Sequence, residues 1–269
     1  MAASTNAKPG CQTNAWRILP GDFKAFLSVL DRIRAHQYKG FETGFRNVQE
    51  HFDKPKPARR DIEKFQLEFL GIHIFLLDYD PKTSIPSFDL IERVATGGAA
   101  LGAKRLIISG LGLFKDGSID KDALARKTAA IDRAGRMCLK LDLTLAYHNH
   151  DVEFQSGGAE IGELLKSTDR DLVRLMLDAG HAYLAGAHVP AFFQQHHRRI
   201  EGFHLRDFRK REQVPLGEGE FDLMPLAELM NKRGWRGWVI NEEERPNDGR
   251  PGDEAVAPAR SHLRKVFGV

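Results

Sequence analysis

Cysteine is scarce in this chain, which has only Cys11 and Cys138 among its 269 residues. The two lie far apart in the sequence and form no CxxC pair. This argues against a disulfide scaffold and against a cysteine-based zinc site, and it favours a reducing compartment. The first ten residues, MAASTNAKPG, also lack the apolar core of a secretory signal. We therefore expect a cytoplasmic protein.

Long apolar runs and a strong excess of one charge are also missing. No stretch approaches the ~20 apolar residues of a membrane span. Lysine and arginine number 40 and the acidic residues 37, a net charge of +3. So small an excess, spread along the chain, argues against nucleic-acid binding. The 42% of hydrophobic residues excludes a disordered chain, so we expect a globular protein with a small-molecule partner.

Several familiar catalytic motifs are absent. No GxGxxG follows the first apolar run, which argues against a doubly wound dinucleotide-binding sheet. No GxSxG elbow is present, which argues against a serine hydrolase. No glycine-rich phosphate loop stands out after the last two expected strands, so the sequence favours an unphosphorylated substrate.

Short apolar runs instead alternate with longer amphipathic segments. We expect strands at residues 12–16, 40–45, 71–77, 105–109, 144–148, 173–178, 200–205 and 237–241. We expect helices at residues 22–36, 87–101, 121–141, 159–167, 189–196, 223–233 and 254–267. The basic, proline-containing run 54–60 and the polar stretch 246–253 are expected to be loops.

The spacing of these strands predicts the fold class. Successive strand ends lie roughly 27 to 39 residues apart, close to the ~30 residues of a βαβ unit. Eight such units account for nearly the whole chain, which predicts an α/β protein with a (β/α)₈ TIM barrel. We expect one domain over residues 1–269, with residues 1–10 as a flexible N-terminus.

Metal-binding residue types recur at the ends of the later strands. Glu153, Asp178, His204 and Glu242 lie at or just past the ends of four successive expected strands and are 25, 26 and 38 residues apart. Taken singly, Asp178 can cap a helix, His204 can be a core residue and Glu242 can be a solvated loop charge. Together they form an O₃N set that suits one divalent ion of Mn, Mg, Co or Zn. Because barrel sites form at strand ends, we expect these four residues to be the metal ligands.

The fifth strand ends in two histidines, His148 and His150. Side chains alternate along a strand, so these two share a face. Imidazole titrates near working pH, which makes His150 a candidate general base. His148 is a candidate for substrate binding, or for a metal ligand in place of Glu153 or besides it.

Three further residues are candidates for substrate binding. His181 follows Asp178 at the start of a loop and can hydrogen-bond a substrate oxygen. Arg206 shares a strand face with His204 and can stabilise an oxyanion, although a salt bridge with Asp207 or a carboxylate at the barrel mouth is an equal alternative. Glu42 ends the second expected strand and can reach the same cavity.

At these residues the chain resembles the sugar phosphate isomerase/epimerase family, the xylose isomerase-like TIM barrels. The motifs that carry the resemblance are YHNHDVEF, LDAGHAYLAG, HLRD, PLGEGEFD and RGWRGWVINEEE. The resemblance implies a metal held by Glu, Asp, His and Glu, which places Asp178, His204 and Glu242 directly. Many relatives have a glutamate where this chain has His148, so Glu153 is assigned as the fourth ligand. His150 matches a histidine that relatives use near the substrate.

The resemblance implies a divalent-metal-dependent isomerase or epimerase of a keto-sugar or polyol. Such an enzyme removes a proton next to a carbonyl and passes through an enediolate, with Glu153, Glu242 and His150 as the candidate catalytic groups. The YHNH strand end is also similar to inosose dehydratases, so a lyase acting on a keto-inositol or 3-keto-sugar is the alternative. An abasic-site endonuclease would need more ligands and a basic surface. A non-catalytic sugar-binding barrel and the oligomeric state stay open.

Overall fold

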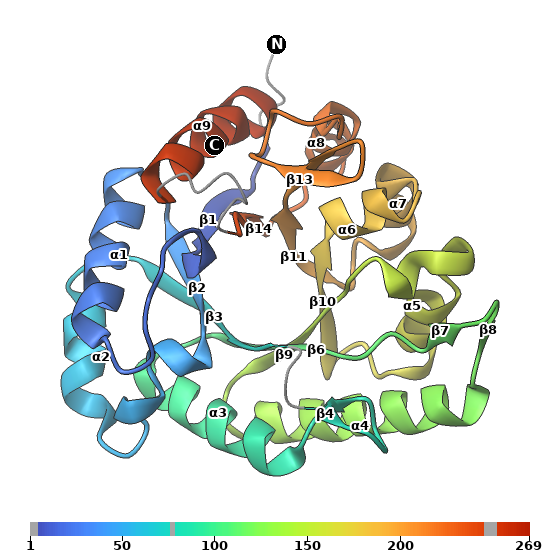
Figure 1. Ribbon diagram of the computed structural model, residues 1–269, viewed down its shortest axis with the longest axis horizontal. Helices are drawn as coiled ribbons and strands as arrows, with labels where there is room; N and C mark the ends of the chain where they lie inside the picture. The colour runs from blue at the N-terminus through green and yellow to red at the C-terminus, as the bar shows by residue number, and fades with distance from the viewer. Residues whose placement is uncertain (1–4, 76–78, 245–251) are drawn as a thin grey trace.

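The computed structural model describes residues 5–75, 79–244 and 252–269. Within them, parallel strands close into a barrel in the order β1-β14-β11-β10-β9-β6-β3-β2, and helices surround it (Figure 1). This is the predicted (β/α)₈ barrel, in one domain. Its strands are β1 (Lys8–Gln12), β2 (Gly40–Gly44), β3 (Glu68–Ile74), β6 (Arg105–Ser109), β9 (Thr144–His148), β10 (Val173–Asp178), β11 (Ile200–Leu205) and β14 (Trp238–Asn241).

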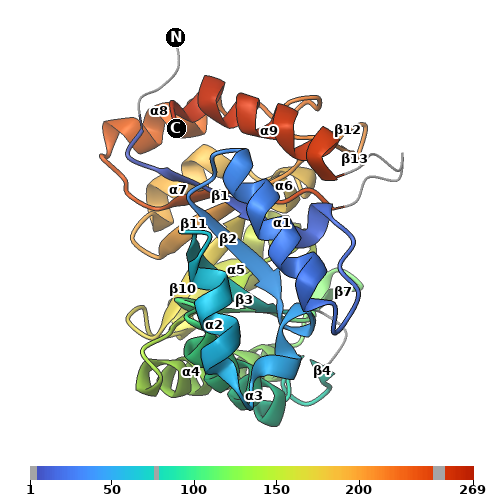
Figure 2. The ribbon, with the colours of Figure 1, turned by 90° about the vertical axis from the view of Figure 1, so that its left-hand side faces the viewer.

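The surrounding helices occupy most of the segments between these strands. They are α1 (Phe23–Ala35), α2 (Pro55–Glu63), α3 (Phe88–Leu101), α4 (Lys121–Lys140), α5 (Gln155–Ser167), α6 (Ala179–Leu184), α7 (Val189–His196), α8 (Met224–Lys232) and α9 (Gly252–Phe267). Figure 2 shows α1 and α2 lying against the strands on the side that faces the viewer, with α9 along the top of the view. None of the helices in the described residues is long and apolar enough to cross a bilayer.

Small sheets and 3₁₀ turns fill the loops after the strands. The two-stranded sheets pair β4 (Tyr79–Asp80) with β5 (Ile85–Pro86), β7 (Phe114–Lys115) with β8 (Ser118–Ile119), and β12 (Asp207–Arg209) with β13 (Glu212–Val214). The 3₁₀ turns are η1 (Thr13–Ala15), η2 (Phe45–Asn47), η3 (Gln49–His51) and η4 (Val152–Phe154).

Helix α3 shows how the local sequence sets these elements. The Ser87 side chain accepts a hydrogen bond from the Leu90 N–H at 3.3 Å and caps the first turn. Gly102 ends the helix with a φ of +102°, a conformation that glycine adopts without strain. The buried side chains recur at helical spacing, so one face packs against the barrel: Ile91, Val94, Ala95 and Leu101.

The barrel interior has an apolar layer beneath a polar one. The apolar layer is a cluster separate from the main core and consists of Leu70, Ile107, Ala146, Met176, Trp238 and Ile240. Glycine leaves room for these side chains: a Cβ at Gly40 would lie 2.7 Å from the Leu70 Cδ2 and 2.8 Å from the Glu68 carbonyl oxygen. Above it, at or just past the strand ends, lie buried polar residues: Gln12, Glu42, His73, Ser109, His148, Asp178, His204 and Glu242.

The first barrel strand differs from the expected one. It runs over Lys8–Gln12, and residues 13–15 form η1 instead of continuing the strand. Residues 8–10, expected within a flexible N-terminus, therefore belong to the barrel, whereas residues 1–4 lie outside the described residues. Pro9 and Gly10 read as strand breakers in the sequence, but a Cβ at Gly10 would lie 2.8 Å from Leu70 inside the barrel.

Three other segments also differ. Helix α2 replaces the expected loop at residues 54–60, because Pro55 is tolerated in the first turn and Ala58 and Ile62 bury one face. The third strand ends at Ile74; residues 76–77 of the expected strand lie outside the described residues. Of the expected loop 246–253, residues 246–251 lie outside the described residues, and Gly252 begins α9.

Candidate metal centre

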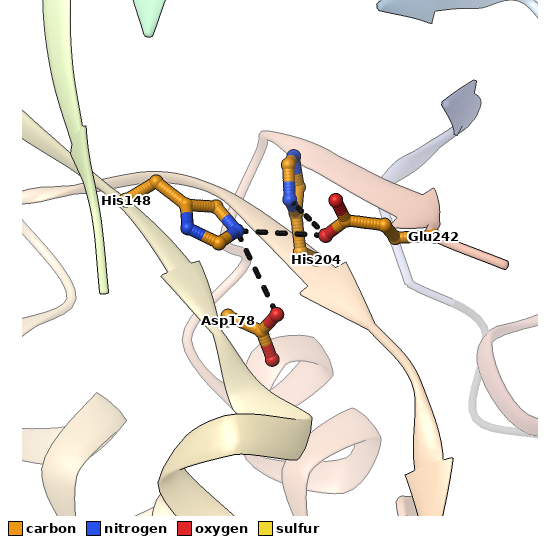
Figure 3. Close-up of side chains that lie close together, drawn as sticks. All are labelled: His148, Asp178, His204 and Glu242. Atoms are coloured by element: carbon orange, nitrogen blue, oxygen red, sulfur yellow. Dashed lines mark ion pairs between the residues drawn. The ribbon is translucent and has the colours of Figure 1, made fainter. Parts of the chain in front are cut away.

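Four side chains from neighbouring strands converge at the carboxyl end of the barrel (Figure 3). They are His148 from β9, Asp178 from β10, His204 from β11 and Glu242, which follows β14. The His148 Nε2 lies 3.6 Å from the Asp178 Oδ2 and 3.4 Å from the Glu242 Oε2. The His204 Nδ1 lies 2.6 Å from the same Glu242 oxygen. One potential ligand atom from each residue thus lies within 4.8 Å of the others.

The converging ligand atoms are buried: His148 Nε2, Asp178 Oδ2, His204 Nδ1 and Glu242 Oε2. None makes a hydrogen bond of good geometry in the described part of the chain, although the two carboxylate oxygens form ion pairs with Arg206. Buried polar atoms are normally satisfied by a partner, and a cation at this point would be shared by all four. Two imidazole nitrogens and two carboxylate oxygens are donors that suit Mn²⁺, Co²⁺ or Zn²⁺. The residues therefore fit a divalent metal.

The protonation state of His148 suits a metal ligand. Burial lowers its pKa from the ordinary 6.5 to about 3, so the imidazole is neutral. The Ser109 Oγ lies 3.3 Å from its Nδ1. A proton on Nδ1, shared with Ser109, leaves the lone pair on Nε2, the atom that faces the other three side chains.

Arg206 sets the charge of the two carboxylates. Its Nε lies 2.7 Å from the Asp178 Oδ2, and its Nη2 lies 2.7 Å from the Glu242 Oε2. Burial raises the pKa of both carboxyls, but the guanidinium outweighs it and holds both below their ordinary values. Arg206 thus pairs with carboxylates at the barrel mouth rather than with Asp207. Asp207 instead accepts backbone N–H groups of the following loop, from Phe208, Gly217, Gly219 and Phe221.

Asp178 also caps the next helix, with its other oxygen. Its Oδ1 accepts the His181 N–H at 2.7 Å at the start of α6. The side chain of Asn149 fixes the Asp178 backbone by accepting its N–H at 2.9 Å and donating to its carbonyl at 3.1 Å. The oxygen that caps the helix and the oxygen that faces the other three side chains are therefore different atoms of one fixed carboxylate.

Glu153 lies outside this group of four, contrary to its expected place among the ligands. The chain turns into η4 after β9, and Glu153 is fully buried there. Its Oε1 accepts the Tyr147 hydroxyl at 2.7 Å, and its Oε2 accepts the His150 N–H at 3.1 Å. The carboxylate holds the backbone of His150, and His148 takes the position next to Asp178.

A cavity of about 160 Å³ adjoins the group. Of the predicted site residues, His148, His150, Arg206 and Glu242 line it, together with His73, Phe75, Ser109 and Glu244. His181 lies behind His150, with ring centroids 5.1 Å apart, and does not line the cavity. Glu42 lies next to His204 and His73. A larger cavity of about 780 Å³ is lined by residues of β7, β8, α4 and α5 and by none of these site residues.

Sequence reasoning missed His73 and Ser109. Each is the last inward-facing residue of its strand, the position that Asp178 and His204 occupy in theirs. His73 stood in the middle of the expected strand 71–77, and the true strand ends three residues earlier. A correct end for the third strand would have pointed to His73. The strand end at Ser109 was predicted correctly, but a single serine carries no metal-ligand or acid–base signal in the sequence.

Comparison with known proteins is consistent with this geometry. The chain is 27% identical over 282 residues to the inosose dehydratase of Lacticaseibacillus casei, covering 91% of this chain and 90% of that protein. A sugar phosphate isomerase/epimerase from Parabacteroides distasonis superposes with a TM-score of 0.76 at 18% identity, over 98% of this chain and 96% of that one. The IOLI protein, solved with a zinc atom, superposes with a TM-score of 0.77 at 15% identity, over 97% and 98%.

The two structural likenesses show a shared fold. Residues 23–266 match the model of the family described as Xylose isomerase-like TIM barrel. The match spans most of the chain and agrees with the closed eight-stranded barrel. This protein therefore belongs to the xylose isomerase-like TIM barrel family.

Proposed function

We propose that this protein is a divalent-metal-dependent lyase that removes water from a keto-polyol of the inosose type. The observation that carries the proposal is the convergence of four buried ligand atoms, two on imidazoles and two on carboxylates, beside a small cavity. Relatives named inosose dehydratase, which match nearly the whole chain, support this reaction over sugar isomerisation. A small-molecule substrate and a cytoplasmic location belong to the proposal.

The ligands in this proposal are His148, Asp178, His204 and Glu242, with His148 in place of Glu153. These residues would hold a divalent cation, which would supply Lewis-acid polarisation of a substrate carbonyl when bound. Arg206 lines the cavity, and its guanidinium faces developing negative charge on a substrate oxygen.

His150 is the proposed proton carrier. It lines the cavity, and its buried Nδ1 makes no hydrogen bond in the described residues. His150 takes the proton from the carbon next to the carbonyl. The electron pair of that C–H bond forms a C=C bond to the β-carbon, and the β-hydroxyl takes the proton back from His150 as its C–O bond breaks, so that it leaves as water. The backbone contact from Glu153 holds His150 in place for this transfer.

An isomerase or epimerase is the second candidate, because its first step is the same. A proton returned to the opposite face of the carbon gives an epimer, and one returned to the neighbouring carbon gives an isomer. The solved D-psicose 3-epimerase shares the fold, with a TM-score of 0.75 at 14% identity. The fate of the β-hydroxyl separates the two candidates.

The test is incubation of Mn²⁺-loaded protein in D₂O with a panel of keto-inositols and ketohexoses, followed by NMR. The lyase predicts loss of water from a keto-inositol and appearance of the ultraviolet absorbance of a conjugated enone. His150→Gln should lose this activity and keep the metal. Epimers without water loss would support the second candidate, and absence of deuterium exchange with every substrate would contradict both.

A further inference from the structure

One buried carboxylate holds two of the histidines at the barrel mouth. Glu42 ends β2 on the inward face and is fully buried. Its Oε2 lies 2.7 Å from the His204 Nε2 and 2.8 Å from the His73 Nε2. These distances are those of charge-assisted N–H···O hydrogen bonds. Both imidazoles therefore carry a proton on Nε2, because an ionised carboxylate only accepts.

Both contacts are made by the same carboxylate oxygen, Glu42 Oε2, and Glu42 is fully buried. A buried carboxylate oxygen shared by two imidazole N–H groups fixes the orientation of both rings. The carboxylate is part of the polar layer and does not line the cavity, so it acts on the site through the two rings.

The hydrogen bond to Glu42 determines which ring nitrogen of His204 is free to bind a metal. With Nε2–H donated to Glu42, only Nδ1 is left as a ligand, and Nδ1 lies 2.6 Å from the Glu242 Oε2. Figure 3 shows the second ring nitrogen of His204 pointing away from the other three side chains. Metal-binding histidines are oriented in this way by a carboxylate on the far nitrogen.

The hydrogen bond to Glu42 also determines which ring nitrogen of His73 can contact a substrate. Its ring lines the cavity and stacks on His204, with centroids 5.4 Å apart, and on Phe75, with centroids 5.7 Å apart. With the proton held on Nε2, the lone pair is on Nδ1. His73 then has an acceptor for a substrate hydroxyl.

We propose that Glu42 is a positioning residue that fixes the tautomers of His204 and His73, so that metal affinity and substrate orientation depend on one buried carboxylate. This inference rests on the proposed metal site. Glu42, His73 and His204 also lie close enough to hold an ion themselves. That arrangement would need His204 to give its Nε2 to a second metal, and two bound metals per chain would overturn the positioning role.

The test measures the dissociation constant of Zn²⁺ by competition with a fluorescent chelator. Glu42→Gln removes the charge and one acceptor at nearly constant volume, and we expect affinity to fall about 10- to 100-fold. His73→Phe removes the other donor but keeps the Glu42–His204 contact, so affinity should stay near wild type. Glu153→Gln changes an equally buried carboxylate that lies outside the four candidate ligands, and it should also leave the Zn²⁺ affinity near wild type. Unchanged affinity in Glu42→Gln would overturn the proposal.

A second measurement needs no variant. In a ¹H–¹⁵N correlation spectrum of the Zn²⁺-loaded wild type, His204 should show a proton on Nε2 and a coordinated Nδ1. Coordination through Nε2 would contradict the proposal. Asp178→Asn separates the two claims: if it abolishes Zn²⁺ binding while Glu42→Gln binds normally, the metal site holds and only the role of Glu42 fails.

Discussion

Arg206 links the charge of the site to the stability of the barrel. Its side chain is 3% exposed and pairs with Asp178 and Glu242 at 2.7 Å. Replacing one partner of a buried ion pair leaves a buried charge uncompensated and costs about 3–5 kcal/mol. A divalent cation at the proposed site would supply positive charge at the same two carboxylate oxygens.

Arg206→Met should accordingly lower the free energy of unfolding of the metal-free protein by about 3–5 kcal/mol. The same concentration of Mn²⁺ should stabilise the variant more than the wild type, because the repelling guanidinium is gone. Urea unfolding with and without Mn²⁺ measures both effects. The matched control is Arg105→Met, since Arg105 pairs with Glu201 at 2.6 Å at the opposite end of the barrel. An equal response to Mn²⁺ in wild type and Arg206→Met would contradict this role.

The two cysteines should be inert in the folded protein. Burial raises the pKa of Cys138 to about 12, and burial, followed by the charge of Glu243, raises that of Cys11 well above its ordinary value. Both thiols are fully buried and stay protonated at neutral pH. We expect no rapid reaction with Ellman's reagent until denaturant is added, after which both thiols react. Rapid modification of either thiol in the native protein would show that its burial is wrong.

At the scale of elements, close helix–barrel packing depends on glycine at particular positions. Gly135 lies within α4, where a Cβ would lie 2.7 Å from the Leu172 carbonyl oxygen. Gly162 lies within α5 and would meet nothing within 4 Å. The two glycines therefore differ in packing while both lie in helices.

Alanine at these two positions should change stability in opposite directions. Gly135→Ala forces backbone apart and should destabilise by about 1–3 kcal/mol despite the gain in helix propensity. Gly162→Ala should stabilise by about 0.4–1 kcal/mol, because alanine restricts the unfolded chain. Thermal or urea unfolding of both variants gives the comparison. Stabilisation by Gly135→Ala would mean that α4 lies farther from Leu172 than described.

The positions of individual strands and helices show which parts of the fold the sequence could predict. Periodicity placed most barrel strands within a few residues, because each buried strand is an apolar run between helical patterns. It failed at β1, where Pro9 and Gly10 look like breakers, and at α2, where Pro55 occupies a helix start. Asp178 and His204 are the last residue and the next-to-last residue of their strands, so their strand ends predicted where they lie.

Other site residues depend on contacts that spacing does not contain. Glu153 is a carboxylate at nearly the expected interval, but η4 turns it toward Tyr147 and the His150 backbone. Glu42 was expected to contact substrate, and its distances to two imidazoles give it a different place. Such pairings join residues up to 162 positions apart, and only the closed barrel brings them together.

At the scale of the whole molecule, barrel closure creates the site. Adjacent pairing of β9, β10, β11 and β14 places four ligand candidates side by side, although 94 positions separate the first from the last. No single segment carries the site. We expect that one divalent ion binds to these four residues.

The most direct test is the ratio of metal to protein after equilibrium dialysis against Mn²⁺ or Zn²⁺, measured by elemental analysis on wild type and Asp178→Asn. We expect one ion per wild-type chain and loss of that ion in Asp178→Asn, with both proteins folded. Metal retained at wild-type level in Asp178→Asn would contradict the site. Three ions per chain would contradict a single-metal lyase and favour an abasic-site endonuclease.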